Sequence, residues 1–143
     1  METETPAKNK RKKPASKSPT QRALAILKKE GHVACVAERY NAFAGPPGMR
    51  CHACGKNRVG SRSDLFGFID IVYLTKTSTV GLQVTDSTSH SGHKKKILAE
   101  PRALDWLRAG NLIELWSFGL KGGRGEVKRW VLRKEEIVEA DFA

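Results

Sequence analysis

The hydrophobic positions divide the chain into a polar arm, a helix and a series of strands. Residues 1–18 show no apolar periodicity and are rich in Lys, Pro and Ser, which predicts a disordered basic arm. In residues 19–30 the apolar positions follow a helical spacing, and Gly31 ends the segment. Residues 32–40, "HVACVAERY", alternate with the period of a strand.

The strongest strand signal is "FGFIDIVYLT" at 66–75, where β-branched and aromatic residues dominate. "TVGLQVT" at 79–85 follows a short polar turn and is its expected hairpin partner. Helical segments are predicted at 93–100 and, starting from Pro101, at 101–110. Two further strands, 111–120 and 126–134, flank a Gly-rich turn. The predicted order is α-β-β-β-α-β-β.

Two domain-level features follow from this pattern. Residues 19–143 are expected to form one α/β domain after the arm. Within it, residues 41–63 form a long connection rich in Gly, Pro and Cys, and long connections in compact domains tend to be functional or mobile.

Charge narrows the class of partner. The 143 residues carry a formal net charge of +11, which favours a polyanion, nucleic acid first and an anionic membrane surface second; simple solubility is the alternative. No apolar run reaches the ~20 residues that cross a bilayer. No secretory signal is visible, and the three cysteines are an odd number, so we expect a reducing, cytoplasmic location.

Three residues in the expected hairpin suggest a cation site. Gln83 and Thr85 share one face of their strand because side chains alternate with a period of two. If the two strands pair, Asp70 comes beside Gln83. Carboxylate and amide oxygens suit Mg²⁺, and a bound Mg²⁺ can polarise a phosphate and activate water.

The block from "RSDLFGFIDIVYL" to "GLQVT" resembles the PD-(D/E)xK nuclease-like family. The similarity is to its Holliday-junction-resolvase-like branch and to uncharacterised phage and bacterial proteins, and it covers about residues 21–132. The resemblance implies a central mixed β-sheet flanked by helices, with a restriction-endonuclease-like α-β-β-β-α-β core. It also implies Mg²⁺ (or Mn²⁺) as cofactor, cleavage of DNA rather than RNA, and a homodimer.

Carried over residue by residue, Asp70 matches the family's metal-binding aspartate and Gln83 its acidic position. Thr85 falls at the position of the catalytic lysine and cannot supply a positive charge. In some branches the lysine comes from a neighbouring element, which makes Lys94, Lys95 and Lys96 candidates for its role.

Glu38 and Asp64 are further candidate metal ligands. Glu38 closes the first predicted strand, and its alternative role is a surface ion pair with Arg39. Asp64 precedes the central strand, where its alternative role is to cap a loop.

Cys51 and Cys54 have the spacing of a zinc half-site, which needs two more ligands. The alternative is a Gly-rich loop with two free thiols, with Cys35 as a small core residue. Zinc is therefore the less favoured cofactor.

Basic residues outside the central block are candidate phosphate contacts. They are Lys12, Lys13, Lys96, Arg124, Lys128 and Arg129. Trp116 and Trp130 lie on the last two predicted strands, where core packing across the strands is favoured over base stacking. The sequence thus favours a divergent metal-dependent DNA endonuclease or resolvase-like phosphodiesterase; the alternative is a non-catalytic nucleic-acid-binding module on the same fold.

Overall fold

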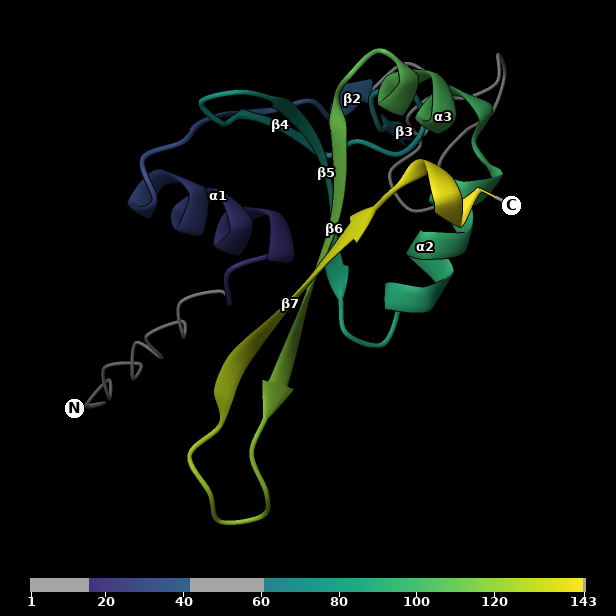
Figure 1. Cartoon of the computed structure of the whole chain (residues 1–143). Helices are drawn as coiled ribbons and strands as arrows, with labels where there is room; N and C mark the ends of the chain where they lie inside the picture. The colour runs from purple at the N-terminus through teal and green to yellow at the C-terminus, as the bar shows by residue number, and fades with distance from the viewer. Residues whose placement is uncertain (1–15, 42–60, 143) are drawn as a thin grey trace, which may run out of the picture.

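The computed structural model describes residues 16–41 and 61–142 (Figure 1). Its main sheet has five strands in the order β1-β4-β5-β6-β7. Their bounds are Val33–Val36, Ile71–Leu74, Thr79–Asp86, Leu112–Lys121 and Arg129–Ile137. All neighbours are antiparallel except β5 and β6, which are parallel. A separate antiparallel pair joins β2 (Arg39–Asn41) to β3 (Ser61–Ser63).

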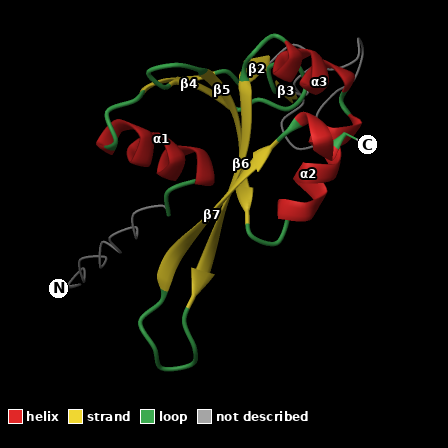
Figure 2. Cartoon of the chain, viewed as in Figure 1, coloured by secondary structure: helices red, strands yellow, loops and turns green. Residues whose placement is uncertain are grey.

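Helices cover both faces of the main sheet (Figure 2). Helix α1 (Pro19–Lys29) packs on one face, whereas α2 (His90–Ala99) and α3 (Pro101–Arg108) lie on the other. A short 3-10 turn, η1 (Glu139–Asp141), follows β7. The α2–α3 segment is the crossover that parallel neighbours such as β5 and β6 require. The predicted α/β class, with a mixed sheet flanked by helices, is confirmed.

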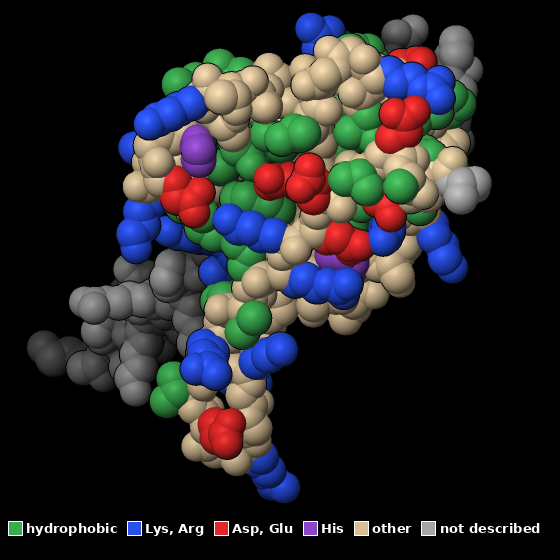
Figure 3. All heavy atoms as spheres, in the orientation of Figure 1, with side chains coloured by type: hydrophobic (Ala, Val, Ile, Leu, Met, Phe, Trp, Pro, Cys, Tyr) green, Lys and Arg blue, Asp and Glu red, His purple; other side chains and the backbone are tan. Residues whose placement is uncertain are grey.

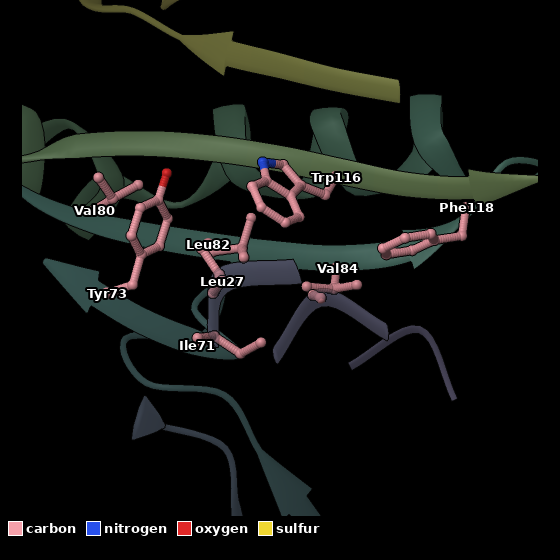
Figure 4. Close-up of a cluster of buried hydrophobic side chains, with 9 residues drawn as sticks. Leu27, Ile71, Tyr73, Val80, Leu82, Val84, Trp116 and Phe118 are labelled. Carbon is pink, nitrogen blue, oxygen red and sulfur yellow. The ribbon is translucent and has the colours of Figure 1, made fainter. Parts of the chain in front are cut away.

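Each face of the sheet has its own hydrophobic cluster. The cluster under α1 includes Ala23 and Leu27 of the helix and Tyr73, Leu82 and Trp116 of three strands (Figure 4). Tyr73 Oη and Trp116 Nε1 both donate to Glu114 Oε2, at 2.8 and 2.7 Å, so the polar atoms of these large side chains have a partner. The opposite cluster packs α2 and α3 on the strands through Phe68, Ile69, Ile97, Ala103, Ile113, Leu115 and Ile137.

Helix α1 begins where the sequence predicts. Ser18 and Gln21 form a reciprocal capping box, in which Gln21 N–H donates to Ser18 Oγ at 3.3 Å and Ser18 N–H to Gln21 Oε1 at 3.0 Å. This fixes the first turn of α1, which forms one wall of the groove described below.

Two predicted strands are shorter than expected. The segment 66–75 is a strand only from Ile71, because Phe66 and Gly67 take positive φ values of 52° and 80° and form a tight turn. The segment 32–40 divides into β1 and β2, and between them the Ala37 and Glu38 N–H groups both donate to Asp70 O, at 2.8 and 3.3 Å.

The C-terminal elements are shifted relative to the predictions. Helix α2 begins three residues before the predicted 93–100, at His90. Strand β7 runs from Arg129 to Ile137 rather than over 126–134. Trp116 is buried, but it lies opposite Lys134, and the half-exposed Trp130 lies opposite Leu120. The expected pairing of the two tryptophans was wrong because the Gly-rich turn is longer than predicted and shifts the register.

The β6–β7 hairpin projects beyond the body of the domain (Figures 1 and 3). Residues 120–130 are all exposed. In the described part of the chain, no helix is long and apolar enough to cross a membrane.

Candidate functional site

A groove of about 550 Å³ opens between the first turn of α1, the second half of β5 and the side of α2. Its polar lining includes Glu38, Asp64, Asp70, Gln83 and His93. The structure thus brings together the four predicted metal-ligating residues, although they are spread from the end of β1 to the middle of β5.

Asp70 lies at the floor of the groove, immediately before β4. Its backbone N–H donates to Leu82 O at 3.0 Å, which ties it to β5. Its Oδ2 accepts from Val84 N–H at 2.9 Å and from Gln83 Nε2 at 2.6 Å. The predicted contact between Asp70 and Gln83 across paired strands is therefore confirmed, with the Gln83 amide as donor.

Burial sets the protonation of this carboxyl. Only 7% of Asp70 is exposed, and burial raises its pKa from 3.8 to about 7. The Val84 N–H opposes this shift, whereas the neighbouring Asp64 and Glu38 carboxyls raise the pKa further. A carboxyl held so far from its ordinary range in a groove is typical of functional sites.

Gln83 leaves a buried acceptor without a partner. The residue is 2% exposed, and its Oε1 forms no hydrogen bond to any described residue. A buried amide oxygen without a partner costs about 1–3 kcal/mol. Such a cost is offset if a ligand supplies the missing contact.

Asp64 connects this groove to helix α2. Its Oδ2 accepts from Lys96 Nζ at 2.7 Å, and its carboxyl is one of the neighbours that raise the pKa of Asp70. Glu38 lies 3.8 Å from Arg62 Nη1, rather than pairing with Arg39 as in the alternative role. The groove therefore holds three carboxyls, with cations at two of them.

The other two lysines of the cluster have different surroundings. Lys94 Nζ donates to Glu135 Oε1 at 2.5 Å, on the far side of α2. The same carboxylate contacts His90 Nε2 at 2.5 Å, and His90 Nδ1 lies 2.8 Å from Ser117 Oγ. Lys95 is exposed and forms no salt bridge with any residue of 16–41 or 61–142. Only Lys96 of the three contacts a described carboxylate of the groove.

Thr85 is buried in β5, opposite Ser117 of β6, and does not line the groove. Its predicted place in the site therefore has no contact to support it. The position where the resemblance expects lysine carries a strand residue packed inside the fold.

His93 and Gln21 are among the lining residues that were not predicted as part of this site. His93 Nδ1 is buried and has no partner among the described residues, and burial lowers the His93 pKa, with Lys96 adding to the shift. Gln21 reaches the groove from the capping box of α1. A signal for His93 was present, because residues three apart on a helix share a face and Lys96 follows it at that spacing.

Across residues 16–41 and 61–142, no three His, Cys, Asp or Glu side chains are arranged as a ready-made metal-binding group. The predicted zinc ligands Cys51 and Cys54 and the arm residues Lys12 and Lys13 lie outside the described residues. Cys35 is exposed, so its alternative role as a core residue was wrong; it lies on the edge strand β1.

Comparison with known protein families, curated proteins and solved structures finds no match for this chain.

Proposed function

We propose that this protein is a divergent metal-dependent DNA endonuclease, resolvase-like in its chemistry, and that the groove at Asp70 is its active site. The observation that carries the proposal is the Lys96–Asp64 contact, which brings a lysine from α2 to the carboxyl cluster at Asp70. The resemblance to PD-(D/E)xK nucleases implies a lysine near this carboxyl, and Thr85 cannot supply its charge.

The order of the elements supports a restriction-endonuclease-like core. Helix α1 precedes three antiparallel strands, β1, β4 and β5, and a helical crossover then leads to the parallel strand β6. With α2 and α3 counted as one crossover, this order is compatible with the α-β-β-β-α-β core that the resemblance implies. Strands β2, β3 and β7 are additions to it.

The polar side chains of the groove suit a divalent cation. Mg²⁺ is commonly held by one or two carboxylates with waters completing its shell. Asp70 and Asp64 would supply the carboxylates and Gln83 Oε1 the amide oxygen, with Glu38 as a further acid. The neighbouring carboxyls add to the raised pKa of Asp70, and the Gln83 Oε1 acceptor has no described partner. A bound cation would stabilise both features.

When bound, the metal would polarise a phosphate oxygen and activate water for attack on phosphorus. Lys96 would stabilise the negative charge that develops on the phosphate. His93 lies beside it with a lowered pKa, so it is neutral near pH 7 and available to hydrogen-bond water or phosphate. Lys95 and Lys94 are less suited to catalysis, since the first has no groove contact and the second neutralises Glu135.

A non-catalytic nucleic-acid-binding module is the second candidate. It is favoured by the buried Thr85 at the lysine position and by the lack of three clustered ligands among the described residues. The two candidates share the basic surface and differ in whether Asp70 supports hydrolysis.

The test is cleavage of a DNA panel (single-stranded, duplex, nicked and four-way-junction) in the presence of Mg²⁺ or Mn²⁺, with EDTA as the metal-free control. We expect Asp70→Ala to abolish cleavage while leaving DNA binding intact. Cleavage that survives Asp70→Ala rejects the site. Binding without cleavage of any substrate supports the second candidate.

Lys96→Ala and Lys95→Ala form a matched pair for the relocated lysine. Both residues lie on α2, but only Lys96 contacts Asp64. We expect Lys96→Ala to lower cleavage by roughly 100-fold or more, the usual cost of one charge-stabilising group. Lys95→Ala should leave it within a few-fold, and equal losses in both variants would argue against a specific role.

A further inference from the structure

We propose that the β6–β7 hairpin is an arm that holds the phosphate backbone of a DNA duplex about 6–9 base pairs from the bond cut in the groove. This inference rests on the proposed function and specifies its substrate: a duplex arm that extends to one side of the cleaved bond.

The projecting end of the hairpin, residues 120–130, contributes little to the core. Residues 120–130 are all exposed, and Val127 near the turn is 91% exposed. Figure 3 shows Lys and Arg side chains spaced along the projecting segment, with an acidic side chain near its end. A projecting β-ribbon of this kind is narrow enough to enter the major groove of a duplex.

The cations of the hairpin are not neutralised by the rest of the described structure. Lys121 and Arg129 lie directly opposite each other across the two strands, an arrangement that destabilises a sheet. Neither they nor Arg124 and Lys128 form a salt bridge within residues 16–41 and 61–142. The nearby Glu126 accepts instead from Gly123 N–H, at 2.9 Å. An opposed pair of like charges is explained if an anion lies across both.

The base of the hairpin is held to the body. Arg22 of α1 stacks over the ring of Trp130, with its guanidinium carbon 3.7 Å from the ring centroid. Trp130 pairs with Leu120 across the strands, on the ribbon face opposite Lys121 and Arg129. One face therefore ties the hairpin to α1, which leaves the cationic face available to a ligand.

The pairing register of β5 and β6 sets the distance from the groove to the end of the hairpin. Gln83 in the groove lies beside Leu115 of β6, and β6 continues past the end of β5 to Lys121. Six residues of strand span about 20 Å, and the turn at 122–125 lies up to about 30 Å away. Because a duplex rises 3.4 Å per base pair, these distances correspond to about 6–9 base pairs.

The test compares two double variants that each remove two charges. Lys121→Gln/Arg129→Gln changes the opposed pair, whereas Lys28→Gln/Lys29→Gln changes two exposed lysines at the other end of α1. Binding to a 30-base-pair duplex is measured by fluorescence anisotropy between 50 and 300 mM salt, in an Asp70→Ala background, so that cleavage plays no part. These conditions span the range in which counterion release is visible, roughly 0.05–0.3 M.

We expect the affinity of the hairpin variant to fall about 10-fold or more near 0.1 M salt. The slope of log K against log salt concentration should become smaller in magnitude by about two, which corresponds to two lost phosphate contacts. The control variant should change the slope by less than about one. Equal losses in both variants, or no loss in the hairpin variant, would overturn the proposal. So would an unchanged duplex affinity with a loss of binding to phosphatidylserine vesicles.

A second measurement tests the distance. If the wild type cleaves, duplexes that end about 4 base pairs from the cut on one side should be cleaved at least several-fold less efficiently than those that end about 12 away. The hairpin variant should lose this dependence. Cleavage that does not depend on duplex length would reject the proposed role of the hairpin. If the protein never cleaves but the hairpin variant shows the smaller salt slope, the nuclease function is rejected and the hairpin remains a DNA-binding element.

Discussion

Asp70 and Glu135 are two carboxyl groups near helix α2, and their surroundings shift their pKa values in opposite directions. Glu135 accepts from Lys94 and contacts His90, and these partners hold its pKa below the usual range. Asp70 is more buried, has acidic neighbours, and has its pKa raised to about 7. Helix α2 thus supplies residues 90 and 94 to one carboxyl and residues 93 and 96 to the groove of the other.

The difference separates a structural carboxylate from a candidate functional one. The Glu135 cluster is complete, because its buried His90 has partners at both ring nitrogens and its carboxylate has cations beside it. At Asp70, Gln83 Oε1 and His93 Nδ1 lack described partners, and three carboxyls share two cations. Contacts within the fold account for the first cluster, whereas the second leaves buried polar atoms without a described partner.

The largest expected effect is the pH dependence of stability at Asp70. Its folded pKa lies above its unfolded value, so the folded protein retains a proton that the unfolded chain has lost. The free energy of unfolding therefore falls as pH rises from about 4 to about 7, by on the order of 3 kcal/mol from this group. Asp70→Asn removes this contribution, since the amide stays neutral.

Urea unfolding of the wild type and Asp70→Asn at pH 4, 5.5, 7 and 8 measures this effect. We expect Asp70→Asn to be close to the wild type near pH 4 and more stable above about pH 7. The difference between the two proteins is the quantity to read, because other carboxyls titrate in both. If that difference is independent of pH, Asp70 titrates near its ordinary value.

A smaller effect is expected at the complete cluster. Glu135→Ala leaves the buried His90 and its neighbour Lys94 without their acceptor, which we expect to cost about 1–3 kcal/mol of stability. Glu136→Ala, at the adjacent exposed position, should stay within about 0.5 kcal/mol. Thermal and urea unfolding at pH 7 give both values. If Glu135→Ala is as stable as the Glu136→Ala control, Glu135 is not a structural carboxylate and its proposed difference from Asp70 fails.

The smallest effect is expected for Lys96. Its side chain is 47% exposed, so Lys96→Ala should change stability by less than about 1 kcal/mol. Its effect on cleavage, in contrast, should be large if the groove is catalytic. A variant that loses activity and stability together would instead make Lys96 a structural residue. Urea unfolding and single-turnover cleavage of the same preparation separate these outcomes.

Much of the fold follows from local patterns in the sequence. The capping residues before α1, the alternation in 79–85 and the Pro101 helix start each predict an element that the structure contains. The strand 66–75 was predicted too long because β-propensity outweighed a turn that depends on Phe66 adopting a positive φ. Such a conformation is uncommon for an aromatic residue and has no sequence signal.

The candidate site was predicted only in part. Asp70 and Gln83 could be paired from strand geometry alone, since they lie on neighbouring segments of a hairpin. Which lysine reaches the groove could not be predicted, because it depends on where α2 starts. The helix begins at His90, and the way it packs on the sheet places Lys94 against Glu135 and Lys96 against Asp64.

The parallel pairing of β5 and β6 has a consequence for how the protein acquires its groove. These strands can pair only after residues 87–111 have folded back across the sheet, and such long-range closure is slow compared with the formation of hairpins or single helices. His93 and Lys96 arrive with that crossover. The groove at Asp70 and Gln83 therefore gains its helix-borne residues only when the crossover packs on the sheet.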